Sequence, residues 1–236
     1  MILQPLEIPP KSYARIAGGL YLVIAVSGGF SIGYVPSIII VADAPAATAS
    51  NLLAHVTLFQ AGILGDIIVV LAEIILTAML YVLFAPISMT LSLIAAWSRI
   101  AMVVVMGGNI LLNIIPMFLL GADFLNGFDP AALQAVAFAF FGAHDLGVYI
   151  WQLFFGLHLL ALGYMIIKSD LFPRILGWMM LIGAFGYLLQ GIVKVIDMEN
   201  AAVSVVIIGL LALVTIGELA FAFYLLIKGI KPAPTS

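Results

Sequence analysis

The sequence predicts an all-α protein: a polytopic transmembrane helical bundle of about six spanning helices, with two short interfacial helices. The chain of 236 residues is 65% hydrophobic and 8% charged, whereas a soluble domain carries about 25% charged residues. Its mean hydropathy is +1.31. Several apolar stretches reach the roughly 20 residues that a spanning helix needs. We therefore expect the lipid bilayer to surround a single integral membrane domain of residues 1–236.

The apolar stretches predict where the spans begin and end. The first stretch, Ile16–Val41, exceeds the core of about 7–15 residues typical of a signal peptide, so we interpret it as an uncleaved span. Pro86 and Pro173 lie in short connections and favour helix ends there. The predicted spans are residues 14–36, 58–84, 89–116, 145–167, 173–195 and 202–228.

Two helix-prone stretches remain outside these spans. Ala46–Leu58 and Ala131–Ala143 each precede a span directly. We interpret both as short interfacial helices, which gives a weak internal repeat at residues 46–113 and 131–194. Ala-rich composition alone could also produce this pattern.

The basic residues predict the orientation, because they gather on the cytoplasmic side of membrane proteins. Six spans put both termini on one side, and with the termini in the cytoplasm most basic residues fall there. These are Lys11, Arg15, Lys168, Arg174, Lys228 and Lys231.

Composition also excludes several classes of function. The chain has no cysteine, which excludes disulfides, thiolate metal sites and cysteine nucleophiles. Its net charge of −3 argues against nucleic acid as a partner. No recognised metal-ligand spacing is present, and the sequence identifies no cofactor.

Polar residues inside the predicted spans are the candidate functional residues, because an ionisable side chain in a membrane is rare and costly. The stretch "GDIIVVLAEIIL" (Gly65–Leu76) carries two carboxylates seven residues apart, on one helical face. Helix geometry predicts two layers of polar side chains in the bundle. The candidates for ligand or proton binding are Glu73, Arg99, His158 and Glu218 in one layer, and Asp66, Asn109, Asn113 and Gln152 in the other.

The contact that the sequence supports best joins Glu73 to Arg99. Each lies about 13 residues from the centre of the turn between the second and third spans, so both should reach the same depth. A guanidinium can bind a carboxylate through two hydrogen bonds. The alternative to a functional role is a structural ion pair that sets the helix register.

The carboxylates outnumber the arginine in this region. Asp66, Glu73 and Glu218 are three potential negative charges against one guanidinium. Four explanations stay open: a carboxyl is protonated, His158 is cationic, Lys194 reaches down, or a ligand supplies positive charge.

His158 has further interpretations. It could ligate haem with His144 or His55, but about 21 Å of helix separates it from His144, which is too far for one iron. A metal site with Glu73 and Asp66 is a second interpretation. A hydrogen-bonded core histidine is favoured over both.

Four stretches together resemble an uncharacterised bacterial membrane family, the domain of unknown function number 4386. They are "RIAGGLYLVIAVSGGFS" (15–31), "FQAGILGDII" (59–68), "FFGLHLLALGYMIIKSDLFPRILGWMMLIGAFGYL" (154–188) and "GELAFAFYLLIKGI" (217–230). The resemblance implies a bacterial inner-membrane protein of six or seven spans and implies no activity. It places six residues in family-like positions: Asp66, Arg99, His158, Lys168, Pro173 and Glu218.

Three functions agree with these observations. The first is binding or movement of a proton or a small, lipophilic molecule, with a cavity among the polar residues; a solid core of directly paired groups would count against it. The second is an accessory subunit whose polar core is internal glue, with a membrane-protein partner or a homo-oligomer. The third is an intramembrane enzyme on a lipid-like substrate, with His158 and a carboxylate as acid and base.

Overall fold

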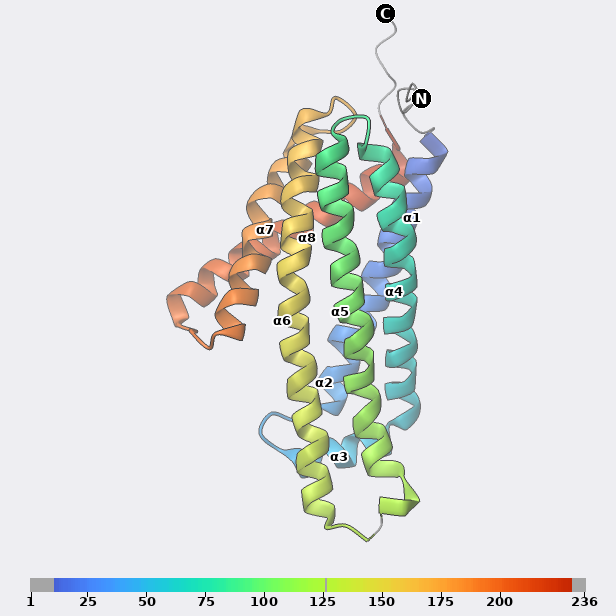
Figure 1. Cartoon of the computed structure of the whole chain (residues 1–236), viewed down its shortest axis with the longest axis vertical. Coiled ribbons are helices and arrows are strands. Elements are labelled where there is room, and N and C mark those ends of the chain that lie inside the picture. The colour runs from blue at the N-terminus through green and yellow to red at the C-terminus, as the bar shows by residue number, and fades with distance from the viewer. Residues whose placement is uncertain (1–10, 126, 231–236) are drawn as a thin grey trace, which may run out of the picture. The chain divides into compact units, whose positions relative to one another are not determined.

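The computed structural model describes residues 11–125 and 127–230, and these residues contain helices and no β-strand (Figure 1). Six helical segments within this part of the chain are long and apolar enough to cross a membrane. The predicted all-α polytopic bundle is confirmed. The helices are α1 (Lys11–Gly28), η1 (Gly29–Tyr34, a π-helix), α2 (Val35–Ile39), α3 (Pro45–Ala54), α4 (Val56–Phe84), α5 (Met89–Gly121), η2 (Asp123–Leu125, a 3₁₀-helix), α6 (Pro130–Lys168), α7 (Arg174–Val195) and α8 (Ala201–Ile227).

Local chemistry explains where several helices begin. The Ser92 hydroxyl donates a hydrogen bond to the Tyr81 carbonyl at 2.8 Å, which closes the hairpin between α4 and α5. Pro173 is extended (φ −64°, ψ 125°) and precedes the first residue of α7. Asn200 caps α8, because its side-chain oxygen accepts a hydrogen bond from the Val203 amide at 3.0 Å.

One predicted interfacial helix is wrong as a separate element. Ala131–Ala143 is the first part of α6, which continues without a break to Lys168. No proline interrupts this run, and 39 helical residues extend about 58 Å, well beyond the roughly 30 Å of a hydrocarbon core. The other predicted stretch, Ala46–Leu58, does contain a separate helix, α3, which ends before α4 begins at Val56. The structure therefore gives less support to the predicted internal repeat, because one half has a separate short helix and the other half does not.

The chain divides into two compact units. Unit 1 comprises residues 11–23, 72–103 and 149–230 of the described chain. Unit 2 comprises residues 24–71 and 104–148. The helices α1, α4, α5 and α6 contribute residues to both units. The single domain expected from the sequence stays a prediction.

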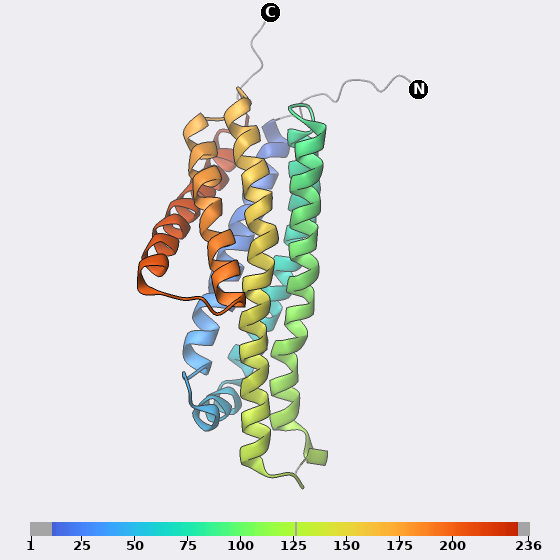
Figure 2. The ribbon, with the colours of Figure 1, turned by 60° about the vertical axis from the view of Figure 1, so that its left-hand side comes forward.

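Unit 1 is built on close helix contacts at glycines. Helices α7 and α8 pack side by side, as both views show (Figures 1 and 2). A Cβ atom on Gly183 would lie 2.5 Å from the Cβ of Val214, and one on Gly163 would lie 2.8 Å from the Gly177 carbonyl oxygen. Side chains at these glycines would push the helices apart, since small residues let membrane helices approach closely.

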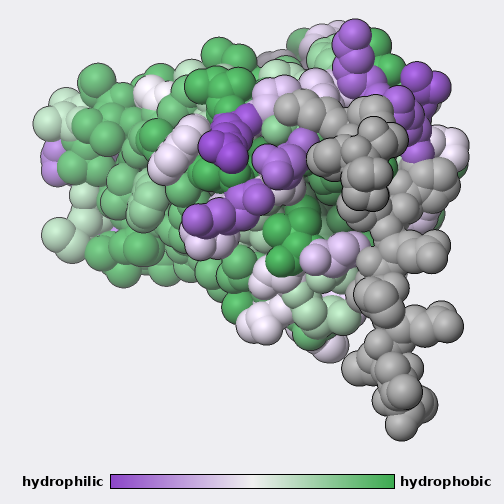
Figure 3. Space-filling view, turned by 90° about the horizontal axis from the view of Figure 1, so that it is seen from above, coloured by the Kyte–Doolittle hydropathy of each residue, from purple (hydrophilic) through white to green (hydrophobic). Residues whose placement is uncertain are grey.

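Hydrophilic side chains gather at one end of unit 1, where α1 and α7 begin and α6 and α8 end (Figure 3). Arg15 donates a hydrogen bond to the Ile227 carbonyl at 3.2 Å, and Arg174 lies 3.7 Å from the Asp170 carboxylate. Five of the six basic residues predicted to be cytoplasmic thus lie on these helix ends, and Lys231 lies outside the described residues. The side of the membrane that they face stays a prediction.

Unit 2 has its own apolar core. The Phe59 and Phe141 rings meet edge to face, with centroids 5.9 Å apart. Gly62 on α4 faces Val35, and a Cβ atom there would lie 3.1 Å from that side chain. The π-helix η1 sits in the first span of this unit, and such segments are frequent at functional sites. The core residues are Val35, Ile39, Leu52, Phe59 and Phe141.

Candidate functional site

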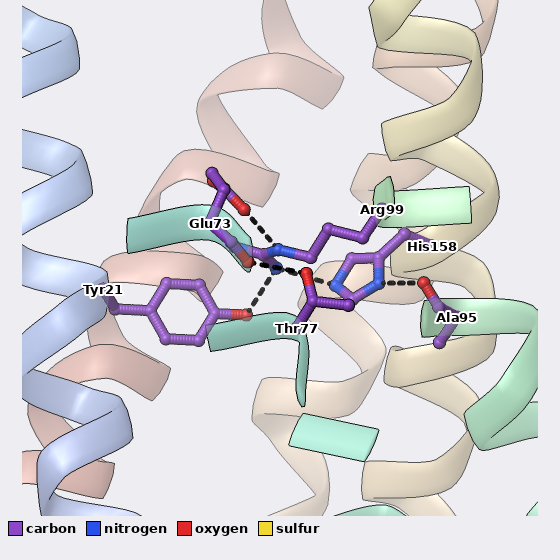
Figure 4. A network of polar contacts seen from close by, with 6 residues as sticks. All are labelled: Tyr21, Glu73, Thr77, Ala95, Arg99 and His158. Carbon is purple, nitrogen blue, oxygen red and sulfur yellow. Dashed lines mark hydrogen bonds and ion pairs between the residues drawn. The ribbon is translucent and has the colours of Figure 1, made fainter. Parts of the chain in front are cut away.

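Arg99 is the centre of a buried polar network in unit 1 (Figure 4). Its Nε donates a hydrogen bond to the Glu73 carboxylate at 2.5 Å, and the two residues are 1% and 3% exposed. The predicted contact between Glu73 and Arg99 is confirmed. The Thr77 hydroxyl, one turn further along α4, donates to the Glu73 carbonyl at 2.7 Å. The hairpin of α4 and α5 thus brings together two opposite charges that neither helix could bury alone.

His158 from α6 completes this network as a neutral side chain. The Arg99 Nη1 lies 2.9 Å from His158 Nε2, and a guanidinium can only donate, so Nε2 accepts. The other ring nitrogen, Nδ1, lies 2.9 Å from the Ala95 carbonyl oxygen, which can only accept, so Nδ1 carries the proton. His158 is therefore not the cation that could balance a surplus carboxylate. Neither ring nitrogen is left to ligate haem or a metal in this arrangement.

Two aromatic rings, those of Tyr21 and Phe155, also contact this network. Arg99 Nη1 also donates to the Tyr21 hydroxyl at 3.2 Å, and its guanidinium carbon lies 5.1 Å from the centre of that ring. The Phe155 ring lies 5.6 Å from the same carbon and stacks on His158. A cavity beside Thr77 has a volume of about 10 Å³, at the limit of room for one water. The region is a closed set of paired groups.

Glu218, predicted in the same layer, lies apart from the hydrogen bonds of Arg99. It is half-buried, and its Oε2 accepts a hydrogen bond from the Tyr187 hydroxyl at a long 3.5 Å. Arg99 attracts this carboxyl and Glu73 repels it. Lys194 does not supply the balancing charge, because it pairs with Glu199 and lies over the Tyr149 ring.

Asp66 has a very different setting, in unit 2. The residue is 8% exposed and lines a cavity of about 110 Å³. No salt bridge joins it to a basic side chain in the described part of the chain. An engineered dry cavity of about 150 Å³ holds a benzene molecule, so this space can hold a small organic molecule. Most of the lining is apolar: Ile32, Val35, Pro36, Ile39, Ile40, Phe59, Gly62, Ile63, Phe141 and Val148.

Ser31 lies beside Asp66 in this cavity, and the sequence did not identify it. Ser31 is 6% exposed, and its hydroxyl oxygen has no hydrogen-bond partner among the described residues. It belongs to η1, and Gly65 leaves space for it, because a Cβ atom there would lie 3.1 Å from the Ser31 Cβ. An unpartnered buried hydroxyl is uncommon in proteins and needs an explanation such as an unseen water or ligand.

Asn113, His144 and Asp145 supply the other polar groups of the lining. The side chains of Ser31, His144 and Asn113 lie near the Asp66 carboxyl, but no hydrogen bond of normal geometry joins Ser31 to it. The His144 Nδ1 lies 3.8 Å from the exposed carboxylate of Asp145. The cavity therefore combines the buried carboxylate of Asp66 and the exposed one of Asp145 with further polar groups and an apolar wall.

The remaining predicted residues have other roles. Asn109 does not line the cavity; its amide nitrogen donates to the His144 carbonyl oxygen at 3.1 Å and joins α5 to α6. Gln152 belongs to unit 1, where its side-chain oxygen is buried without a hydrogen-bond partner in the described chain. Of the two predicted layers, one thus supplies Glu73, Arg99 and His158 to the network in unit 1, and the other supplies Asp66 and Asn113 to the cavity in unit 2. Sequence reasoning missed Tyr21 and Ser31, because it assigned no polar face to the first span.

Comparisons with known proteins agree with the resemblance seen in the sequence. The family described as Domain of unknown function (DUF4386) matches residues 16–229. An uncharacterized protein of Archaeoglobus fulgidus is 27% identical over 171 residues, which cover 72% of this chain and 84% of that protein. No solved structure matches.

Proposed function

This chain belongs to the DUF4386 family, and we propose that it binds a small molecule within its membrane-spanning helices, in the cavity of unit 2. One observation carries the proposal: Asp66 is buried, lines a cavity large enough for an organic ligand, and forms no salt bridge with a lysine or arginine in the described chain.

The cost of desolvation is the physical reason. A buried charge without a partner costs several kcal/mol, so such a group is found where a proton, an ion or a ligand compensates it. A proton alone would need no cavity. The Asp66 cavity offers a carboxylate, a free hydroxyl at Ser31 and an apolar wall, which is the usual composition of a small-molecule site.

The Arg99 network supports a structural role for its own region. Its charges are paired, and His158 is held by two hydrogen bonds. An enzyme that used His158 as acid or base would need a free ring nitrogen within reach of a substrate. We therefore assign ligand binding to the Asp66 cavity and not to His158, Glu73 or Arg99.

A substitution that fills the cavity with a larger side chain tests this function. Ile63 lines the cavity, and its neighbour Leu64 is 57% exposed on the outside of α4. We expect Ile63→Trp to abolish ligand-induced thermal stabilisation of the purified protein in nanodiscs, and Leu64→Trp to preserve it. The probes are amines, alcohols and carboxylic acids of about five non-hydrogen atoms, sized to the cavity. The proposal fails if no probe stabilises the wild type, or if the Ile63→Trp protein responds equally.

We also propose a plasma-membrane location with both termini in the cytoplasm, supported by the basic residues on the shared helix ends. The chain has no cysteine, so single cysteines report cleanly. In intact cells, a membrane-impermeant maleimide should label Asp43→Cys, in the connection between the first two spans, and should not label Lys228→Cys. Reversed labelling would overturn the orientation.

A further inference from the structure

We propose that the ligand of the Asp66 cavity is a small primary alkylammonium, whose charged group meets the Asp66 carboxylate and whose hydrocarbon part meets the apolar wall. This inference rests on the proposed function and adds the chemical class of the ligand. Four features of unit 2 carry it: its charge, its hydrogen-bonding groups, its apolar wall and the size of the cavity.

The permanently charged residues of unit 2 are all acidic. Residues 24–71 and 104–148 contain five aspartates and no glutamate, lysine or arginine, whereas all eight basic residues of the chain lie elsewhere in the sequence. The two histidines of unit 2 are the side chains there that could become cationic. His144 lies beside the carboxylate of Asp145, 3.8 Å away. A unit with this composition attracts cations and repels anions.

The polar groups of the lining match the donors of an ammonium. A primary ammonium has three N–H donors and no acceptor. The Asp66 carboxylate, the unpartnered Ser31 hydroxyl and the Asn113 side-chain carbonyl are acceptors in the same cavity. Bonding to an ammonium would satisfy the Ser31 oxygen and compensate the Asp66 charge together.

A bare metal ion fits the cavity less well. Calcium takes six to eight oxygen ligands, and magnesium needs nearly ideal octahedral geometry. The lining is mostly hydrocarbon, including Ile39, Ile63 and the edge-to-face pair of Phe59 and Phe141. Aromatic faces also attract ammonium groups. The wall therefore favours a cation that carries its own hydrocarbon.

The cavity volume limits the length of the ligand. About 110 Å³ is smaller than the cavity of about 150 Å³ that holds the six carbon atoms of benzene. A chain of about five non-hydrogen atoms fits, so n-butylammonium is the probe. 1-Butanol has the same number of non-hydrogen atoms without the charge, and tetramethylammonium has the charge without N–H donors.

Binding to the full-length protein in nanodiscs, measured by calorimetry at pH 7, tests the inference. We expect n-butylammonium to bind at least tenfold more tightly than 1-butanol or tetramethylammonium. Asp66→Asn should weaken n-butylammonium at least tenfold, which equals about 1.4 kcal/mol, and Ser31→Ala should weaken it severalfold. Asp43→Asn is the matched control, because it removes an exposed aspartate from unit 2 at a backbone φ of 54° that asparagine tolerates. It should bind like the wild type.

Four results would overturn the inference, and they differ in whether the proposed function survives. If 1-butanol binds as tightly as n-butylammonium, and Ile63→Trp blocks both, the cavity binds small molecules but does not select amines. The proposed function then survives and the ligand class is wrong. If Ile63→Trp leaves n-butylammonium binding unchanged, or if no probe binds the wild type, both proposals fail. Equal binding of n-butylammonium to the wild type and to Asp66→Asn also refutes the ligand class.

Discussion

Glu73 and Asp66 lie seven residues apart on α4, and their surroundings differ at every level. Glu73 is bound by Arg99, which is in turn bound by His158 and Tyr21, and little space remains beside them. Asp66 faces a cavity and an unpartnered hydroxyl. Of two carboxylates on one apolar helix, one can therefore form a structural cross-link while the other is buried beside a cavity without an ion-pair partner. The available partner, and not the carboxylate, decides which.

We expect the largest loss of stability when the charge that compensates Glu73 is removed. Arg99→Met should lower the free energy of unfolding by about 3–5 kcal/mol, because it leaves an unpaired buried carboxylate. The double variant Arg99→Met with Glu73→Leu should recover most of that loss, since no charge then remains. Thermal unfolding in detergent, followed by circular dichroism, measures both. A single variant as stable as the wild type would show that the network is not the closed cross-link described above.

A matched pair of carboxylate substitutions sharpens the contrast. Glu73→Gln should lower the free energy of unfolding by about 1.5–3 kcal/mol, because it removes a charged hydrogen bond from Arg99. Asp66→Asn should change the free energy by less than about 0.5 kcal/mol or increase it, since it removes a buried charge that has no ion-pair partner. The same unfolding measurement compares them. Equal losses would mean that Asp66 has a stabilising partner in the protein itself.

The smallest expected effects come from removing the hydroxyl groups of two buried serines, Ser92 and Ser31. Ser92→Ala should cost about 1 kcal/mol of stability, because the Ser92 hydroxyl is buried and donates to Tyr81. Ser31→Ala should cost almost nothing, since the Ser31 hydroxyl has no partner to lose. Denaturant titration of both variants checks this. A loss at Ser31 as large as that at Ser92 would argue that the protein already satisfies its hydroxyl.

The sequence predicted what helix geometry alone determines. Glu73 and Arg99 were paired correctly because they are equidistant from one short turn, so their depths are fixed by the rise per residue. Asn113 was likewise assigned correctly to the surroundings of Asp66. Asn109, one turn earlier, was expected there too, yet it bonds to the backbone at His144. Depth follows from counting residues, but the direction of a side chain depends on how helices pack.

Other features had no signal in the sequence. Nothing in Ala131–Ala143 distinguishes an interfacial helix from the first turns of a long span, because both are apolar and helix-prone. A π-helix also departs from the 3.6-residue period on which the interpretation of faces depends, so helical spacing does not place Ser31 correctly. The division into a paired network and an open cavity likewise depends on tertiary contacts.

The π-helix has a consequence for how this site could be lost during evolution. A π-segment contains one residue more than the same length of α-helix needs. Deleting a single residue between Gly29 and Tyr34 would let the segment rewind as an ordinary α-helix, with the helix on either side kept in register and the side chains within the segment repositioned. Hydropathy would barely change, and the span would still cross the membrane. The position of Ser31 against Asp66 is therefore encoded by the number of residues in this segment as much as by their identity, so a relative of equal hydropathy that is one residue shorter here would have an altered site.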